Sequence, residues 1–254
     1  MKDSVAVRRT AHARSRGSTS PRAWSPGRVA AGLVLAAWAG LFWFLSLSGR
    51  DELYLSTRTS WVVAVGAALL TAAAAGLIVS ARVRTSRPLG SREAWVMGLM
   101  VVPVAMILAL PPATLGSFSA SKRPGFSSAG FGGSLADAGS GPLTLVDVAA
   151  AQYSKSGEQA LARRAGEQVD FIGIVTRFAD TPAGEFLLTR YIITCCVADA
   201  TTAQVRVVNV PPGEFQENDW VEVKGPIYPL GKQVIVNATS VEAVTPPARP
   251  YLTP

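Results

Sequence analysis

Three runs of uncharged, mostly apolar residues place the strongest constraint on how this chain can fold. They cover residues 29–49, 59–81 and 94–110. About 20 apolar residues in an α-helix are needed to cross the hydrocarbon core of a membrane. The first run is longer than the apolar core of a usual signal peptide, and the third is short and contains Pro103. The pattern predicts three transmembrane helices within a membrane region at residues 29–110.

The charges in the connecting segments predict the orientation of these helices. Residues 1–28 carry seven basic residues among Ser, Thr, Gly and Pro, a composition typical of a disordered tail. The loop 50–58 has no net charge, whereas the loop 82–93 has a net charge of +3. The positive-inside rule then places the tail and the second loop in the cytoplasm, in a plasma-membrane protein. Everything after residue 111 is expected outside the cytoplasm.

The net charge of the whole chain, +7, belongs to its N-terminal part. Residues 1–110 contain 13 Lys and Arg against 4 Asp and Glu, whereas residues 111–254 contain 11 against 13. The basic balance therefore gives no indication that the C-terminal part binds nucleic acid.

The three apolar runs contain no charged residue. Charged side chains within spans mark the pathways of ions and polar solutes, so a transporter that acts by itself is disfavoured. Small residues recur at helix spacing in two of the runs, which would either permit close helix packing or reflect an alanine-rich composition. These residues are Gly32, Ala36 and Gly40, followed by Ala64, Ala68, Ala72 and Gly76.

The composition changes twice after the third run. Residues 111–142 are dominated by Gly, Ser, Ala and Pro and are expected to form a flexible linker. Residues 143–164 have a helical spacing of apolar residues, among them Tyr153, with an interruption near Gly157. Runs rich in β-branched and aromatic residues follow and predict strands. They cover residues 169–175, 185–196, 203–210, 220–225 and 233–238, with a last short one at 241–244.

Short strands separated by Pro, Gly, Asn and Asp turns predict a small closed barrel of the OB type, with a β-sandwich as the alternative. Gly173 and Gly225 stand within strands where such a barrel must bend. Three aromatic residues of the strands are expected in the core rather than on a nucleic-acid-binding surface. They are Phe171, Phe186 and Trp220. The predicted fold class is membrane α plus β: three transmembrane helices, then a helical segment and an OB-like antiparallel β-barrel at residues 143–254.

The only two cysteines of the chain, Cys195 and Cys196, are adjacent at the end of one predicted strand. Neighbouring residues of a strand point to opposite faces, so both thiols can meet one ligand only if a bulge or turn intervenes. Thiolates favour soft ions such as Zn²⁺, Cu⁺ or a trivalent metalloid. Asp199 would either assist such a cation or cap its own backbone turn.

Three interpretations of the cysteine pair stay open. A closed zinc site takes four ligands, and the domain has no histidine and no third cysteine, so a metal or metalloid site would be open or completed by a partner. An oxidising exterior would also allow a vicinal disulfide. The third interpretation is a pair of small, partly buried thiols. The candidate metal ligands are therefore Cys195 and Cys196, with Asp199 as a third, and the cofactor would be a soft metal such as zinc.

The predicted β-domain offers no recognised catalytic set. His12, the only histidine, lies in the basic tail, which excludes a Ser-His or Cys-His nucleophile from the domain. The sequence also lacks a Gly-rich phosphate loop and a paired-carboxylate motif. We therefore expect a protein that is not an enzyme.

Several motifs of the chain form a recognisable set. They are Pro111-Pro112, Asp170-Phe171-Ile172-Gly173, Arg190-Tyr191-Ile192-Ile193-Thr194-Cys195-Cys196-Val197-Ala198-Asp199-Ala200, Asp219-Trp220-Val221-Glu222-Val223-Lys224-Gly225 and Pro250-Tyr251. Together they resemble the YcgQ-like family of uncharacterised bacterial membrane proteins, described as permease subunits. The resemblance covers residues 143–251 well and the membrane part loosely, and the long basic tail and the Gly/Ser-rich linker depart from it. Such proteins look like partners of a separate multi-span permease, related to exporters of metalloids and organoarsenicals, which would supply the missing polar pathway.

Together these observations predict a non-catalytic accessory subunit of a membrane permease complex, whose extracytoplasmic β-domain binds a soft metal or metalloid. The expected partners are a multi-span permease subunit and the lipid bilayer, with no nucleic acid. The alternative is a cell-surface metal- or thiol-sensing module that acts without a transporter.

Overall fold

The structure is a computed structural model that describes residues 23–83, 89–110, 113–123, 125, 141–152 and 154–253. Most of the predicted basic tail, most of the predicted linker and part of the positively charged second loop lie outside the described residues. The same holds for some residues singled out above, namely His12, Pro111, Pro112 and Tyr153.

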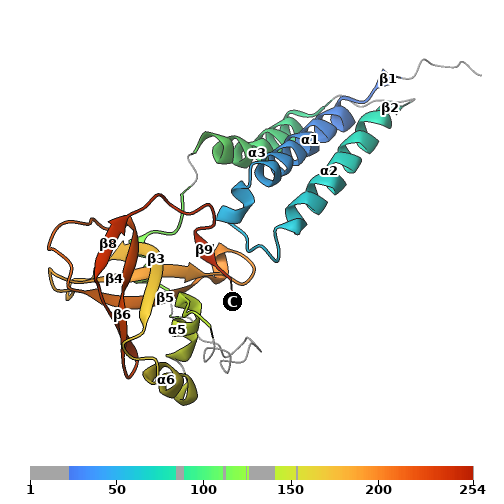
Figure 1. Cartoon of the computed structure of the whole chain (residues 1–254). Helices are drawn as coiled ribbons and strands as arrows, with labels where there is room; N and C mark the ends of the chain where they lie inside the picture. Colours follow the sequence, from blue (N-terminus) through green and yellow to red (C-terminus); the bar gives the residue numbers. More distant parts are fainter. Residues whose placement is uncertain are drawn as a thin grey trace, which may run out of the picture.

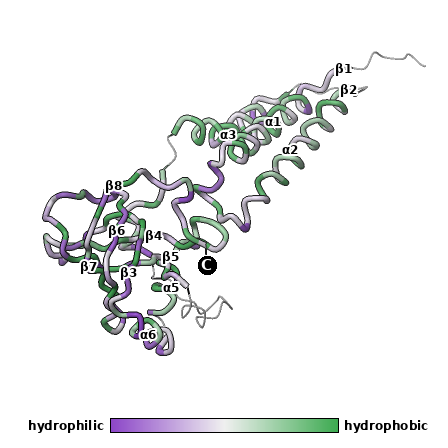
Figure 2. The backbone as a smooth tube through the Cα atoms, in the orientation of Figure 1, coloured by the Kyte–Doolittle hydropathy of each residue, from purple (hydrophilic) through white to green (hydrophobic). Residues whose placement is uncertain are grey.

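Three long apolar helices form the N-terminal part: α1 (Pro26–Leu47), α2 (Trp61–Val79) and α3 (Ser91–Ala109). Each is long and apolar enough to cross a membrane, at 22, 19 and 19 residues respectively. Figure 1 shows them side by side as an elongated bundle, and Figure 2 shows that the bundle is largely hydrophobic. The three predicted spans are therefore confirmed as apolar helices. α3 begins earlier than predicted because Arg92 and Glu93 form its first turn.

The two ends of the bundle differ. At one end, β1 (Ala23–Trp24) pairs with β2 (Arg82–Val83), and the guanidinium carbon of Arg82 lies 5.1 Å from the centroid of a Trp24 ring. At the other end, the connection between α1 and α2 meets the C-terminal domain (Figure 1). The chain runs along the bundle three times, so it enters at the β1–β2 end and leaves at the opposite end, where the C-terminal domain lies.

Small residues allow α1 and α2 to pack closely, but mostly not the ones that the spacing suggested. Gly32 is buried, and a Cβ there would lie 2.7 Å from Cγ1 of Ile78 and 3.4 Å from the carbonyl oxygen of Ala74. The other buried small residues are Ala39, Ala67 and Ala74. From the predicted stripes, Ala36, Gly40, Ala68, Ala72 and Gly76 are exposed. The face of α2 that packs against α1 is therefore marked by Ala67 and Ala74, seven positions apart, and not by the predicted stripe.

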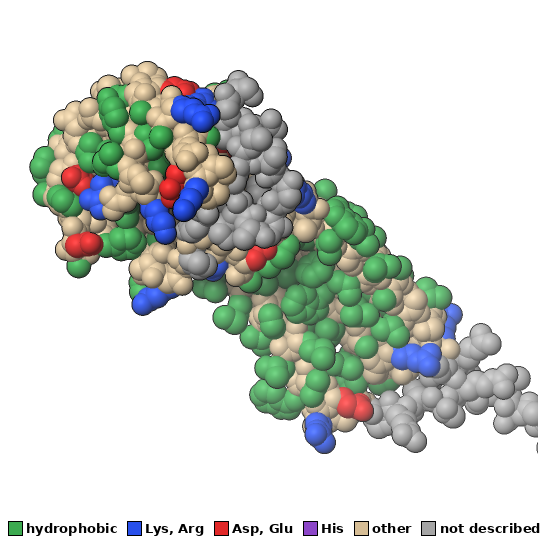
Figure 3. Space-filling model, turned by 90° about the horizontal axis from the view of Figure 1, so that it is seen from below, with side chains coloured by type: hydrophobic (Ala, Val, Ile, Leu, Met, Phe, Trp, Pro, Cys, Tyr) green, Lys and Arg blue, Asp and Glu red, His purple; other side chains and the backbone are tan. Residues whose placement is uncertain are grey.

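Apolar side chains cover the outer surface of the bundle. The space-filling view shows hydrophobic side chains along the helices, with charged side chains on the domain and at the far end of the bundle (Figure 3). On α3, Trp95, Leu99 and Leu108 are among the large side chains that are more than half exposed. A contiguous apolar surface of this kind matches the hydrocarbon of a bilayer.

Five strands of the C-terminal domain close into a barrel. They are β3 (Gln168–Thr176), β4 (Phe186–Ile192), β5 (Thr201–Val208), β6 (Trp220–Leu230) and β7 (Gln233–Asn237). Their hydrogen-bonded order is β3-β4-β5-β7-β6, and the pairing of β3 with β6 closes the ring. β5 and β7 are parallel and the other neighbours in the ring are antiparallel. This order, in which β7 lies between β5 and β6, is that of a small OB-type barrel. The predicted barrel is therefore confirmed and the sandwich alternative is wrong.

Two further strands extend the barrel. β8 (Ser240–Ala243) pairs with β6, and β9 (Tyr251–Leu252), which the sequence pattern missed, runs parallel to β4. The predicted fourth strand ended at Gly225, but β6 continues to Leu230. Its pairing passes from β3 to β7 between Pro226 and Ile227, and a Cβ at the neighbouring Gly225 would overlap the carbonyl oxygen of Asn237. Gly225 is therefore required by a close backbone approach next to this change of partner.

The barrel core holds the aromatic residues expected there. Phe171 and Phe186 are buried in the main core, and Trp220 is buried in a second cluster with Tyr191 and Tyr251. These side chains therefore leave no aromatic platform for stacked bases at their positions.

Two short helices, α5 (Leu145–Ala151) and α6 (Lys155–Ala162), precede the barrel. The predicted interruption near Gly157 is misplaced, because the break lies before Ser154, which caps α6. The hydroxyl of Ser154 accepts a 3.0 Å hydrogen bond from the amide of Gly157. A Cβ at Gly157 would lie 2.7 Å from the backbone of Ala151, so this glycine is needed for the packing of α6 on α5.

Part of the predicted linker lies against the barrel. Residues 113–123 include the short helix α4 (Ser117–Ala120). Tyr191 donates a 2.6 Å hydrogen bond to the carbonyl oxygen of Gly116, and the amide of Ser117 donates one of 2.5 Å to Asn218. These contacts fix the segment that leads from α3 onto the domain.

Candidate functional site

The cysteine pair lies in a turn, not in a strand. β4 ends at Ile192, and the amide of Ile193 donates a 2.9 Å hydrogen bond to the carbonyl oxygen of Leu252. The chain then bends at Thr194 and Cys195 and enters a 3₁₀ helix, Val197–Asp199. The predicted strand over residues 185–196 is therefore too long at its C-terminal end.

Because of this turn, the two thiols lie together. The sulfur atoms of Cys195 and Cys196 are 3.7 Å apart, whereas alternation in a strand would have pointed them to opposite faces. Both are free thiols, and their separation exceeds the about 2.05 Å of a disulfide bond. Cys195 is exposed and Cys196 is half-buried, so the interpretation as a pair of partly buried thiols does not fit Cys195.

Asp199 lies next to the thiols and also caps the turn. Its Oδ1 accepts a 3.0 Å hydrogen bond from the amide of Thr194, and its Oδ2 accepts one of 2.8 Å from the amide of Cys195. One carboxylate oxygen and the two sulfur atoms lie within 4.8 Å of one another. Both predicted roles of Asp199 thus fit its position, because the carboxylate that caps the turn also faces the thiols.

The carboxylate of Asp199 favours the protonated form of the Cys195 thiol. The hydrogen bond to Asp199, followed by the one to Cys196, raises the pKa of Cys195 to about 11, because both partners favour the protonated thiol. Partial burial opposes the ionisation of Asp199. Hydrogen bonds from the Cys195 thiol and from the backbone amides of the turn outweigh it and lower the pKa of that carboxyl. At neutral pH the cluster thus combines an ionised carboxylate with a protonated Cys195 thiol, whose proton a bound cation would replace.

The backbone of the turn forms the docking contact with the membrane helices. Leu55 and Cys196 pair as an antiparallel β-bridge. The amide of Ser56 donates a 3.1 Å hydrogen bond to the carbonyl oxygen of Cys195, and the amide of Val197 donates one of 2.9 Å to the carbonyl oxygen of Tyr54. The α1–α2 connection therefore pairs through its backbone with the segment that carries the thiols.

Two hydroxyl groups complete this contact. The hydroxyl of Ser56, which is buried, donates a 2.8 Å hydrogen bond to the carbonyl oxygen of Thr194, and that of Thr59 donates one of 2.6 Å to the carbonyl oxygen of Cys195. Neither residue was predicted from the sequence. Their one signal was a polar Ser/Thr stretch at the membrane end of a loop, which does not identify a partner more than 130 residues away.

The cluster is an incomplete metal site within the described part of the chain. The group of candidate ligands there has three members, Cys195, Cys196 and Asp199, whereas a closed zinc site takes four ligands. It is exposed on the side of Cys195. Chemically, it can hold a soft cation or metalloid through two sulfurs and one oxygen, and it leaves a coordination position for a ligand from outside.

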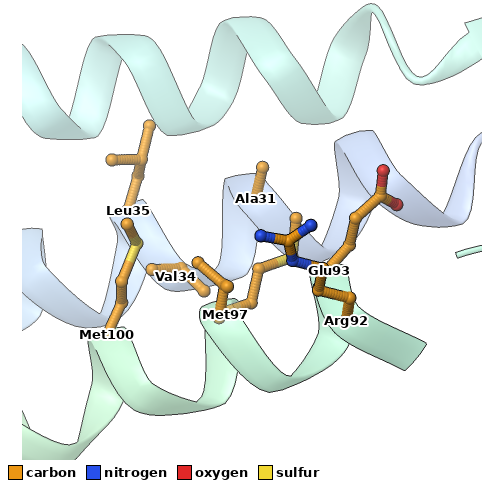
Figure 4. Close-up of a pocket in the computed structure, with 8 residues that line it drawn as sticks. Ala31, Val34, Leu35, Arg92, Glu93, Met97 and Met100 are labelled. Atoms are coloured by element: carbon orange, nitrogen blue, oxygen red, sulfur yellow. The ribbon is translucent and has the colours of Figure 1, made fainter. Parts of the chain in front are cut away.

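An apolar hollow of about 440 Å³ lies between α1 and α3 (Figure 4). Its walls carry Ala31, Val34 and Leu35 from α1 and Val96, Met97 and Met100 from α3, with Arg92 and Glu93 at one end. The walls are aliphatic or thioether groups, so this groove suits an acyl chain or an apolar helix and offers no ligand set for an ion.

Comparison with known proteins finds a family model that is similar to the β-domain. No curated protein matches the chain. Residues 140–254, which include the barrel, the thiols and Asp199, match the family model described as the DUF1980 C-terminal domain, so this part of the chain is similar to that family.

Proposed function

We propose that this chain is a non-catalytic accessory subunit of a membrane permease complex, and that its β-domain binds a soft metal or metalloid at Cys195, Cys196 and Asp199. The observation that carries the proposal is the cluster itself: two sulfurs and a carboxylate oxygen within 4.8 Å, on the segment that docks onto the membrane helices. Thiolates select soft ions, and the ionised carboxylate adds negative charge for a cation.

The accessory role is supported by the character of the helices. Charged side chains within α1 and α3 lie in their first turns, at Arg28, Arg92 and Glu93, and α2 has none. A polar solute therefore needs a pathway that another protein supplies. The resemblance to the YcgQ-like family of permease subunits supports the same division of labour.

An extracytoplasmic β-domain is supported by the arrangement of charges. Arg28 and Arg82 lie at the end of the bundle that is away from the barrel, where the basic tail and the second loop also attach. If that end is cytoplasmic, as the positive-inside rule predicts, the barrel is outside. A membrane-impermeant thiol reagent should then label Cys195 on intact cells, and labelling only after permeabilisation would contradict this orientation.

Metal titration of the full chain in detergent tests the site. Cd²⁺ should bind with one ion per chain and produce thiolate-to-metal charge-transfer absorption, and both signals should disappear in Cys195→Ser/Cys196→Ser. Asp199→Asn should weaken binding, whereas Asp180→Asn, which removes an exposed acid from another turn, should not. Unchanged affinity of the double serine variant would remove the thiols from the proposed function.

Co-purification from mild detergent tests the partner. A multi-span membrane protein should be recovered with this chain, and repeated recovery of the chain alone would contradict the permease role. The docking of the thiol segment on the α1–α2 connection favours the second candidate in that case, a cell-surface metal- or thiol-sensing module, because occupancy of the thiols would act directly on the membrane helices.

A further inference from the structure

A polar hollow of about 540 Å³ lies beside the thiol cluster. One wall is the segment of α4 and the residues after it, including Phe118, Lys122 and Arg123, and the other is the turn of residues 198–201. Asp199 belongs both to this hollow and to the thiol cluster. A ligand that reaches the sulfurs therefore has the hollow next to it.

Positive charge predominates in the lining. Lys122 is exposed and makes no ion pair with a described residue, and Arg123 is half-buried. Asp199, the one acid among the described residues of the lining, already accepts hydrogen bonds from two backbone amides and the Cys195 thiol. Its charge is thus partly balanced by the turn that it caps, and Lys122 and Arg123 outnumber it in the lining.

Arg123 is held in position by the turn. Its Nη1 donates hydrogen bonds of 3.4 and 3.0 Å to the carbonyl oxygens of Ala198 and Ala200. The hydrogen bonds of this guanidinium to described residues use Nη1, which leaves the Nε and Nη2 donors for a ligand. A planar guanidinium with two adjacent donors matches the two oxygens of a carboxylate or phosphate group.

The wall that carries the cations is anchored as well. The amide of Leu115 donates a 3.1 Å hydrogen bond to the hydroxyl of Tyr251, and the hydroxyl of Tyr191 donates one of 2.6 Å to the carbonyl oxygen of Gly116. Because the segment is fixed before any ligand arrives, little ordering cost opposes binding.

We propose that this hollow binds the anionic group of a ligand whose soft atom is held by Cys195 and Cys196. The ligand class is then an anionic soft-metal or metalloid compound, one that carries a carboxylate or similar oxyanion, and not a bare cation. This inference deepens the proposed function and rests on it for the role of the thiols.

Two organomercurials that differ in one group test the hollow: 4-(hydroxymercuri)benzoate and phenylmercuric hydroxide. In each reaction the thiol sulfur forms a bond to mercury, the bond from mercury to hydroxide breaks, and the thiol proton leaves with the hydroxide as water. The full chain in detergent carries Cys196→Ser, so that Cys195 is the one remaining thiol. A small neutral thiol in solution corrects for the intrinsic difference in rate between the two compounds.

After this correction, the benzoate should react with Cys195 about tenfold faster than the neutral compound, as expected for a charged cleft, and added salt should reduce the advantage. Lys122→Gln should also reduce it. The matched control is Lys232→Gln, which removes an exposed lysine from the turn between β6 and β7 and should leave the advantage unchanged. Equal corrected rates, or an equal loss in both variants, would overturn the proposal.

These rates are measured without Cd²⁺ and with Cys195 as the one thiol, so they test the hollow separately from Cd²⁺ binding. Cd²⁺ binding without any preference for the benzoate would overturn the hollow and leave the proposed function standing. A preference for the benzoate in a protein that does not bind Cd²⁺ would leave the anion-binding hollow standing and overturn the metal site of the proposed function.

Discussion

The hydroxyl of Thr59, just before α2, donates a 2.6 Å hydrogen bond to the carbonyl oxygen of Cys195 in the β-domain. The two residues are 136 positions apart, and their contact lies where the membrane helices meet the barrel. The peptide that carries the thiol is therefore also the peptide that holds the domain to the bundle. A ligand that moves Cys195 would change this contact.

Thr59→Val should loosen the docking without removing bulk. The variant keeps the shape of the side chain and loses a hydrogen bond worth about 1 kcal/mol, while the amide of Ser56 still satisfies the Cys195 carbonyl oxygen. The amides of Ser56 and Val197, which are paired across the contact, should exchange with deuterium about fivefold faster. Thr57→Val, at an exposed position in the same loop, is the control. Exchange rates that do not differ from the control would show that this hydrogen bond does not hold the domain.

Asp199→Asn should lower the pKa of Cys195. The carboxylate now raises that pKa, because its charge and its hydrogen bond favour the protonated thiol, so removing the charge favours the thiolate. With Cys196→Ser as background, alkylation of Cys195 by neutral iodoacetamide at pH 7 to 8 should accelerate about tenfold for each unit that the pKa falls. Asp180→Asn should leave the pH profile unchanged. A pKa that stays the same or rises in Asp199→Asn would contradict this account.

Gly225→Ala should destabilise the barrel. The new Cβ would overlap the carbonyl oxygen of Asn237 and lie 3.2 Å from Cα of Ala238, and both obstacles are backbone atoms that cannot turn aside. A cost of about 3 kcal/mol is expected and should appear as a lower denaturation midpoint by circular dichroism. Gly141→Ala, where no atom of a described residue lies within 4 Å of the new Cβ, should unfold at the wild-type midpoint. Equal midpoints for both variants would mean that β6 does not approach β7 as described.

Arg249→Gln should have little effect on docking. Nε of Arg249 lies 3.2 Å from a carboxylate oxygen of Glu52, but the arginine side chain is 67% exposed and the pair is screened by water. We expect a change below about 0.5 kcal/mol in the same exchange measurement, which is smaller than that of Thr59→Val. A larger effect than that of Thr59→Val would place the energy of docking in the ion pair.

The sequence predicted most elements of the fold because their signals are local. Apolar runs identified α1, α2 and α3, and alternating β-branched residues identified β3 to β8. The errors lie where a distant segment decides the outcome. β9 was missed because a two-residue strand has no pattern of its own and exists through its pairing with Tyr191 and Ile192. β6 was predicted to end at Gly225, whereas it continues to Leu230 through its pairing with β7.

The candidate site was predicted only in part. The identity of Cys195, Cys196 and Asp199 could be read from residue types, since soft ligands next to an acid stand out in a chain with two cysteines. Their geometry could not, because the turn that carries the thiols is also bound by Ser56 and Thr59, more than 130 positions away. Lys122 was unremarkable in a segment that composition identified as linker.

By itself, the sequence determined that three helices are long and apolar enough to span a membrane and that a small β-domain carrying a thiol pair follows them. Hydrophobicity and β-propensity are properties of neighbouring residues, so they are written in short stretches of chain. Only the tertiary structure decided that the thiols lie 3.7 Å apart, that Asp199 raises the pKa of Cys195, and that Thr59 binds the same turn. The first two relationships depend on the turn that Asp199 caps, which the alternation of a strand does not predict. The third depends on a hydrogen bond between residues 136 positions apart, which form it because the barrel packs against the connection between α1 and α2.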